Sequence, residues 1–180
     1  MKYYAEYCTS PIGNLMLAAN EQGLVGIWME GQKYFADSLK QQQIIWESNA
    51  LLQPTKEWLD RYFAGEQPQI EGMALAPLGG AFRQAVWHIL CRIPYGQTMT
   101  YGQIAKELAQ QMQRPGMSAQ AVGGAVGHNP ISILIPCHRV VGAGGNLTGY
   151  AGGIDKKLWL LQHEGADISG LTIPKRKRAL

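Results

Sequence analysis

The sequence predicts a small α/β domain followed by a mainly α domain that contains a helix-turn-helix. Three observations support this prediction: short apolar runs separated by turn signals open the chain, helix-spaced apolar residues dominate its second half, and a segment without periodicity lies between the two. Of the 180 residues, 46% are hydrophobic and only 16% are charged. This composition is typical of a folded domain and excludes a disordered chain.

The first half of the chain predicts three strands and two helices. Turn signals at 10–13 and 20–23 separate three runs rich in tyrosine and aliphatic residues. These predicted strands span residues 2–9, 15–19 and 24–29. Apolar residues at helical spacing then predict helices over 34–43 and 54–64, with Gly65 as a stop signal.

The stretch 66–80 contains Pro68 and Pro77, lacks periodicity and is predicted to be a linker. We place the domain boundary near residue 75. The expected domains therefore span residues 1–75 and 76–166, followed by a basic tail over 167–180.

Helical spacing predicts four further helices after the linker. They are a helix near 82–93 that Pro94 ends, one over 101–112 capped by Thr98 or Thr100, one of small residues over 119–126 capped by Ser118, and one that Asp155 caps and Gly165 ends. The second and third of these, joined by a loop, predict the helix-turn-helix. An apolar run over 131–135 is expected to be strand-like, and the last fifteen residues are expected to be loosely ordered.

Charge is distributed unevenly along the chain. Residues 1–77 carry 5 basic and 9 acidic residues, a net charge of −4, whereas residues 78–180 carry 11 basic and 4 acidic residues, a net charge of +7. Only the second part suits a polyanion, although four of its cations lie in the run 175–178 and are equally consistent with a solvated tail. No apolar run approaches the roughly 20 residues that cross a bilayer, and no signal peptide is recognised, so we expect a cytoplasmic protein.

The three cysteines and four histidines predict neither a disulfide framework nor a metal site. Cys8, Cys91 and Cys137 lie far apart in the sequence, and none has metal-ligand spacing to a histidine beyond the adjacent pair Cys137 and His138. At least one thiol is therefore free, and we expect no metal.

Cys137 is the candidate nucleophile, because Pro136 ends the apolar run and fixes the approach to it. A thiol attacks as its thiolate and needs a nearby base or positive charge, which His138 or Arg139 can supply. Arg139 is equally suited to holding backbone carbonyls. The alternative to a reactive Cys137 is a buried cysteine that acts as a small hydrophobic residue. A carboxylate such as Glu164 that orients the imidazole completes the relay typical of activated nucleophiles.

Several strings in this sequence closely resemble the 6-O-alkylguanine-DNA alkyltransferases. They are IPCHRVVG, YGQIA, AVGGAVGHNP, and GYAGG followed by KLWLLQHEG, which together cover about 78–165. The string SPIGNLMLAANEQGLVGIW is similar, more loosely, to the strand meander of the ribonuclease-H-like first domain of that family.

The resemblance implies DNA repair by direct and irreversible transfer of an alkyl group to the protein's own cysteine. The donors would be 6-O-alkylguanine and also 4-O-methylthymine in double-stranded DNA, each molecule would react once, and no cofactor would be needed. The protein is expected to act as a monomer, to bind the minor groove and to extrude the damaged nucleotide from the duplex.

The same resemblance assigns five catalytic roles. Cys137 would accept the alkyl group, and His138 would take its proton through a bridging water. Glu164 would hold and polarise His138, Asn129 would brace the active-site turn, and Tyr101 would donate a proton to guanine N3.

The family pattern also implies binding residues. In the substrate pocket, Tyr150 would form an aromatic wall, the Ala151 N–H would face O6, and main-chain carbonyls near Cys137 and Val140 would read the exocyclic amine. The expected minor-groove residues on the small-residue helix are Ser118, Ala119, Gln120, Ala121 and Gly123. Close packing of that helix inside the domain is the alternative reading of its small side chains, and both can hold on opposite faces.

Two departures from the family pattern stand out. Most members of the family carry, at the position of Gln120, an Arg that fills the gap left by the flipped base, so we expect slower or weaker flipping here. The loop over 110–116, between the two helices of the helix-turn-helix, is longer than in the family pattern, which puts its backbone contacts in doubt.

A non-catalytic helix-turn-helix sensor of alkylated DNA that recruits excision repair is the alternative function, but such proteins replace the cysteine. A cysteine hydrolase is a remote third candidate, because no oxyanion hole is recognised.

Overall fold

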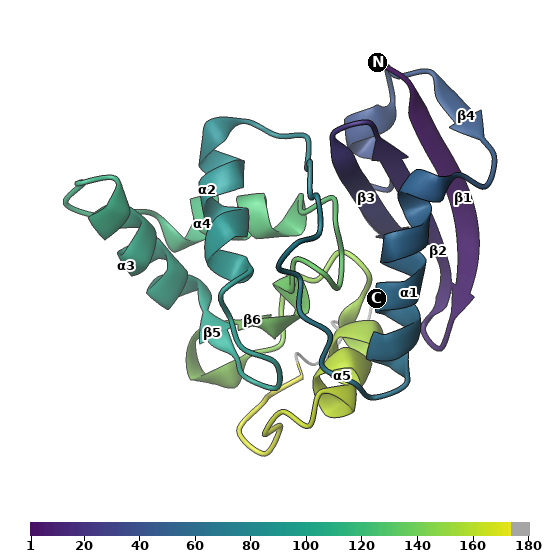
Figure 1. The fold of residues 1–180 in the computed structure, drawn as a ribbon. Coiled ribbons are helices and arrows are strands. Elements are labelled where there is room, and N and C mark those ends of the chain that lie inside the picture. Colours follow the sequence, from purple (N-terminus) through teal and green to yellow (C-terminus); the bar gives the residue numbers. More distant parts are fainter. Residues whose placement is uncertain (174–180) are drawn as a thin grey trace, which may run out of the picture.

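Four strands at the amino terminus form one sheet in the computed structural model, which describes residues 1–173 (Figure 1). The strands are β1 (Tyr3–Ser10), β2 (Gly13–Asn20), β3 (Gly23–Met29) and β4 (Ile44–Trp46), in the order β3-β2-β1-β4. β2 pairs antiparallel with both β1 and β3, whereas β4 runs parallel to β1. The three predicted strands are confirmed, and the three-residue β4 was too short to be predicted from its sequence.

The helix predicted over 34–43 is wrong. The segment contains only a single 3-10 turn, Asp37–Leu39. Tyr34 and Ala36 have φ angles of 60° and 49°, which place both residues in the left-handed region and are incompatible with a right-handed helix. Phe35 and Leu39 instead pack against one face of the sheet.

The other face of the sheet is covered by α1 (Gln53–Phe63), the predicted helix that follows a 3-10 turn at Ala50–Leu52 (Figure 1). Its inward residues Trp58, Leu59 and Tyr62 belong to a buried cluster that also includes side chains from the second half of the chain. The two halves are therefore packed onto one continuous hydrophobic core.

The second half is mainly helical, as predicted. Its helices are α2 (Ala81–Leu90), α3 (Tyr101–Gln111), α4 (Ala119–Gly127) and α5 (Ile154–His163). Thr100 forms a capping box with Gln103 at the start of α3, and the Ser118 hydroxyl accepts from the Ala121 N–H at the start of α4, so both predicted caps are confirmed. α3 packs against α4, and both pack against α2, which gives the predicted helix-turn-helix.

The outer edge of β3 binds two segments from beyond the sheet. The predicted linker pairs with it, because the Leu24 N–H donates to Ala74 O at 2.8 Å and the Ala76 N–H donates to Leu24 O at 2.7 Å. Further along, the Ile27 N–H donates to Pro130 O at 2.8 Å, and the Ser132 N–H donates to Ile27 O at 3.0 Å. These bonds attach the turn that carries the candidate nucleophile to the amino-terminal sheet.

The strand expected over 131–135 is wrong as well. This run consists of turns with one isolated bridge to β3, and Ile133 has a φ of 73°, which breaks an extended strand. The strands of this region are instead β5 (Met99–Thr100) and β6 (Val140–Val141), which form a short parallel pair.

Two expectations for the end of the chain need correction. α5 begins after Gly153, whose φ is 93°, so Asp155 lies in the first turn rather than at the cap, whereas the predicted end at Gly165 is confirmed. The residues at 167–173 are not loose, because the Leu147 N–H donates to Thr172 O and the Thr172 N–H donates to Gly145 O. The basic run 175–178 lies outside the described residues. Within the described part, no helix is both long and apolar enough to span a bilayer.

Candidate active site

Cys137 begins a buried 3-10 turn, Cys137–Arg139, directly after Pro136. Its side chain is only 6% exposed, and the Asn129 amide Nδ2 lies 3.1 Å from its Sγ. The same amide donates to Ile135 O at 2.8 Å, while Asn129 Oδ1 accepts from the Ile131 N–H at 3.0 Å. Asn129 is thus fixed on both sides and presents an N–H to the sulfur, as expected of a residue that braces the turn.

Two opposing effects act on the Cys137 thiol. Burial raises its pKa, because a thiolate is disfavoured away from water. The hydrogen bond from Asn129 and the charge of Lys157 lower it, but burial is the larger effect. The resting group is therefore a neutral thiol, and the reaction requires a base that removes its proton.

His138 is placed to be that base. Its Nε2 lies 2.6 Å from Glu164 Oε1, and both side chains are fully buried. Burial lowers the pKa of His138 despite the neighbouring carboxylate, so the ring is neutral near pH 7. A carboxylate can only accept here, which fixes the proton on Nε2 and leaves the lone pair on Nδ1. Among the described residues, Nδ1 has no hydrogen-bond partner.

Glu164 receives four further hydrogen bonds. Arg139 donates to Oε2 from Nε at 2.8 Å and to Oε1 from Nη2 at 3.0 Å, the Tyr62 hydroxyl donates to Oε1 at 2.7 Å, and the Gly96 N–H donates to Oε2 at 3.1 Å. Burial alone would raise the pKa of Glu164, but His138 and Arg139 together outweigh it and hold this pKa well below its usual range. The carboxylate therefore stays charged and rigid.

Arg139 performs the structural role considered from the sequence, since its Nη1 donates to Ile93 O at 2.6 Å. Its pairing with Glu164 was missed, and so were the contributions of Tyr62 and Gly96. Tyr62 lies 102 residues from Glu164 in the chain. Its only sequence signal was its place on the apolar face of a helix, which predicts burial and nothing more.

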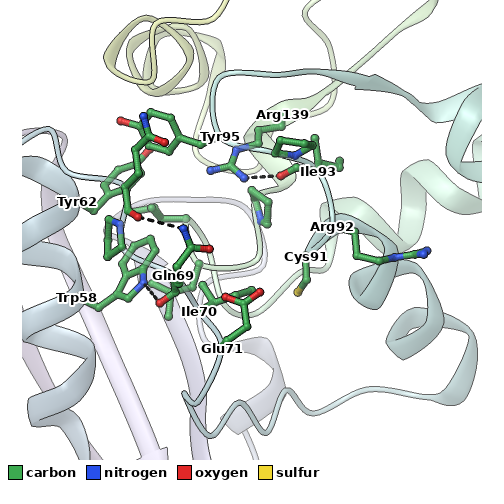
Figure 2. Close-up of a pocket in the computed structure, with 16 residues that line it drawn as sticks. Trp58, Tyr62, Gln69, Ile70, Glu71, Cys91, Arg92, Ile93, Tyr95 and Arg139 are labelled. Carbon is green, nitrogen blue, oxygen red and sulfur yellow. Dashed lines mark hydrogen bonds between the residues drawn. The ribbon is translucent and has the colours of Figure 1, made fainter.

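A cavity of about 340 Å³ lies between the two halves, beside this carboxylate network (Figure 2). Figure 2 shows Tyr62, Tyr95 and Arg139 on one side of it and Glu71 and Cys91 on another. No residue expected to contact the base lines this cavity, so we do not assign the substrate to it.

A second cavity, of about 280 Å³, is lined by two of the three expected pocket residues, Tyr150 and Ala151, whereas Val140 is fully buried and does not line it. Its lining comes from three places in the chain: Gly123, Gly124 and Gly127 of α4 with the adjacent His128, the loop residues Gly149, Tyr150 and Ala151, and the amino-terminal residues Lys33 and Tyr34. Burial, together with the charge of a Cys137 thiolate, raises the pKa of Tyr150 and raises that of Tyr101 to about 12. The Tyr101 hydroxyl donates to Thr148 O at 3.1 Å and keeps its proton near neutral pH. We call this cavity the substrate pocket. Cys137 does not line it, but Tyr101 lies against its glycines, with ring atoms 3.8 Å from the position of a Cβ on Gly123 and the hydroxyl 2.7 Å from that of a Cβ on Gly149.

Lys157 is a buried cation that was not predicted. Its Nζ donates to Val140 O and, at 3.0 Å, to Thr148 O, so the Val140 carbonyl expected to read the base already accepts one hydrogen bond. Burial lowers the pKa of Lys157 to about 8, although Cys137 opposes this shift. Helical spacing could have found it, because Lys157 falls three and four positions before the buried Leu160 and Leu161.

The exposed face of α4 carries only small side chains and one amide. Ser118, Ala119, Gln120 and Ala121 are exposed, whereas Val122, Ala125 and Val126 are buried. Both sequence readings of this helix are therefore compatible with the structure, since its apolar side packs inward and its small residues face outward. A backbone this accessible is suited to close approach to a groove of DNA.

These features define a class of protein. A helix-turn-helix with an exposed small-residue face stands beside a buried thiol and a histidine that a carboxylate orients. The fold and the site are those of a DNA-binding protein that carries its own cysteine nucleophile.

Comparison with known proteins narrows this class. Residues 2–77 match the family model described as 6-O-methylguanine DNA methyltransferase, ribonuclease-like domain, and residues 81–166 match its DNA binding domain. The chain belongs to the 6-O-methylguanine DNA methyltransferase family.

Individual relatives agree. A methylated-DNA–protein-cysteine methyltransferase of Methanosarcina acetivorans is 43% identical over 91% of this chain and 99% of its own length. One from Salmonella typhimurium is 55% identical over 58% of each chain. The crystal structure of Mycobacterium tuberculosis OGT in complex with DNA superposes with a TM-score of 0.76 and 41% identity, covering 91% of this chain and 92% of that one.

Proposed function

We propose that this chain repairs DNA by transferring a methyl or larger alkyl group from 6-O-alkylguanine directly to Sγ of Cys137. One observation carries the proposal: the thiol that Asn129 contacts lies next in sequence to a buried imidazole. Glu164 holds Nε2 of this imidazole, and its Nδ1 has no hydrogen-bond partner among residues 1–173. The relatives named as methylated-DNA–protein-cysteine methyltransferases support the same reaction. 4-O-Methylthymine, whose alkyl oxygen is chemically similar, is the second proposed substrate.

The first step is proton removal. His138 Nδ1 accepts the Cys137 proton through one bridging water, and Glu164 stabilises the imidazolium that forms. The side-chain amide of Asn129 and the charge of Lys157 stabilise the thiolate at the same time. The positive and negative charges created in this step each have a partner that is already in place.

The second step is an in-line displacement. The thiolate forms a bond to the alkyl carbon, and the carbon–O6 bond breaks with its electron pair going to the purine. Tyr101 exchanges its hydrogen bond to Thr148 O for one to N3 and gives N3 its proton, so the base leaves neutral. The Tyr101 phenolate then recovers a proton from the His138 imidazolium through water. The product on Cys137 is a thioether, which water does not cleave readily, and each molecule therefore reacts once.

Substrate delivery requires double-stranded DNA and an extruded nucleotide. Ser118, Ala119, Gln120, Ala121 and Gly123 of α4 approach the minor groove, and the flipped base enters the substrate pocket between Tyr150, Ala151 and the Val140 carbonyl. The complex of the M. tuberculosis relative with DNA supports this partner. The protein acts as a monomer in the cytoplasm, with a first domain over 1–75, a catalytic domain over 76–166 and a basic tail over 167–180.

The proposal is tested by mixing the protein with a duplex that contains one 6-O-methylguanine and measuring intact-protein and peptide masses. One methyl group per molecule, located on Cys137, is the expected result. Tight lesion binding without a mass gain would move the protein to the sensor class, which the presence of Cys137, His138 and Glu164 together disfavours.

Gln120→Arg should speed repair and tighten DNA binding, because a guanidinium can stack on or hydrogen-bond the base left unpaired by flipping. A gain of roughly two- to fivefold is expected, the range of an exposed cation–π contact. Single-turnover rates and fluorescence anisotropy measure it, and Gln22→Arg in the turn between β2 and β3 controls for the added charge. Equal behaviour of the two variants would remove Gln120 from the flipping step.

Lys157→Met should slow alkyl transfer roughly tenfold near pH 7, because the loss of a neighbouring cation raises the thiol pKa and one pKa unit is a tenfold change in thiolate. The deficit should shrink above about pH 8, where Lys157 of the unmodified protein loses its own proton. Single-turnover rates across this range measure the effect, with Lys156→Met as the control. If the ratio of the rate of the unmodified protein to that of Lys157→Met does not change with pH, Lys157 acts only as a hydrogen-bond donor.

A further inference from the structure

The amino-terminal domain contributes two side chains to the substrate pocket, Lys33 and Tyr34. The Tyr34 ring stacks on His128, with 3.9 Å between ring centroids and 23° between planes. His128 directly follows α4, the proposed minor-groove helix. Lys33 Nζ lies 4.7 Å from the centre of the Tyr34 ring. One side of the pocket is therefore built from the domain that is not expected to carry the chemistry.

The backbone holds this arrangement in place. The Lys33 N–H donates to Ala151 O at 3.0 Å, which ties the segment to the loop of Gly149, Tyr150 and Ala151 that also lines the pocket. Tyr34 and Ala36 are non-glycine residues in the left-handed region, with φ of 60° and 49°. Such residues are strained and persist only where their surroundings impose the conformation. In this conformation the Tyr34 ring stacks on His128.

Lys33 is exposed and is not part of any ion pair among residues 1–173. The acidic side chains nearest to it in sequence have other partners. Glu30 accepts from Asn14 at 3.1 Å, and Asp37 pairs with Lys40 at 2.6 Å. The ammonium group is thus available to an anion, although residues 1–77 carry a net charge of −4.

Space is available next to the stacked pair on more than one side. Tyr34 and His128 also border a cavity of about 480 Å³ that includes Arg83, a second cation outside the ion pairs of the described residues. In the substrate pocket, a Cβ added to Gly124 or Gly127 would meet no atom within 4 Å. Packing inside the protein therefore does not require glycine at these helical positions.

We propose that Lys33 and Tyr34 are the amino-terminal domain's part of the DNA site: the Tyr34–His128 stack borders the extruded nucleotide, and the Lys33 ammonium binds a backbone phosphate beside it. The inference rests on the proposed function, because it takes the flipped nucleotide as the occupant of the pocket. Lys33 lies over the Tyr34 ring beside the substrate pocket. The anion of a nucleotide in this pocket is its backbone phosphate, which an exposed ammonium group can bind.

The test pairs a protein change with a DNA change. Lys33→Gln should weaken binding to the lesion duplex about fivefold and lower the slope of log affinity against log salt by roughly 0.9, the loss of one phosphate contact. Lys2→Gln, which removes the same charge from an exposed position in the same domain, should change the slope far less. Both variants should show unchanged thermal unfolding.

Duplexes with a single neutral methylphosphonate linkage, placed in turn at each position within two nucleotides of the lesion, identify the phosphate. When one particular linkage is neutral, the unmodified protein and Lys33→Gln should bind the duplex with the same affinity. The inference is overturned if the difference is the same on every duplex, or if Lys33→Gln and Lys2→Gln behave alike.

Tyr34 is tested separately. Tyr34→Phe keeps the ring and should bind as the unmodified protein does, whereas Tyr34→Ala should lose about as much affinity as Lys33→Gln, with little further loss in the double variant. Additive losses would show that the two residues do not act together. Methylation of Cys137 in the unmodified protein reports on the proposed function independently, so failure of the inference and failure of the function are distinct outcomes.

Discussion

Cys137→Ser should gain no methyl mass from a duplex that contains 6-O-methylguanine, while still binding that duplex. A serine hydroxyl ionises far less readily than a thiol, so the buried His138 cannot generate a comparable nucleophile from it. Peptide mass spectrometry after mixing protein and duplex in equal amounts measures the transfer, and fluorescence anisotropy measures the binding.

Cys91→Ser is the matched control, because Cys91 is a half-buried free thiol outside the substrate pocket. It should be methylated at Cys137 as completely as the unmodified protein. Methylation of Cys137→Ser at another residue would contradict the assignment of Cys137 as the acceptor.

Glu164→Gln should reduce the rate of alkyl transfer by roughly 10²- to 10⁴-fold, the range for loss of general acid–base assistance. A glutamine amide at this position can offer an N–H to His138, which would favour the wrong tautomer, and it cannot stabilise the imidazolium. The same change leaves the Arg139 guanidinium, which is 11% exposed, without its anion, and breaking a buried pair in this way costs about 3–5 kcal/mol of folding free energy.

Single-turnover rates and urea unfolding separate the two effects of Glu164→Gln. Tyr62→Phe is the control, since it removes one neutral donor to the same carboxylate and should cost only about 1 kcal/mol with a small change in rate. A rate loss in Glu164→Gln that merely follows its loss of folded protein would contradict a role for Glu164 in orienting His138.

The acid stability of the protein should depend on the same residue. The folded state holds the pKa of Glu164 below the ordinary value of about 4.5, so the folded protein gains stability from this group above that pH and loses it progressively as the pH falls below. Urea unfolding of the unmodified protein should show this loss, and Glu164→Gln should lack that part of the pH dependence. Parallel pH profiles for the two proteins would contradict the low pKa.

Local features of this fold were predictable because their causes lie within a few residues of sequence. The Thr100 and Ser118 caps and the helix that includes Trp58 are of this kind. The segment after Tyr34 failed because its left-handed turn depends on contacts with His128, almost a hundred residues away. Long-range contacts of that sort leave no periodic signal in the chain.

The site divides in the same way. Cys137, His138 and Glu164 could be proposed from adjacent residues and a strong motif, but the partners that hold Glu164 come from α1 and from the loop before β5. Tyr62 and Gly96 were not predictable, since each contributes through its position in space. Lys157 is an intermediate case, because its burial follows from helical spacing but its contacts with Val140 and Thr148 do not.

The turn that carries Cys137 is attached to β3, and the kind of bond in this attachment determines whether the amino-terminal half can be replaced by that of a relative. The bonds at Ile27 join main-chain atoms only, so they depend on the path of the strand and not on which side chains it carries. The first domain can therefore vary widely in composition and still hold the reactive turn. A chimera should tolerate a foreign sheet that preserves this edge geometry, whereas an insertion of one residue into β3 would shift the register and displace the turn.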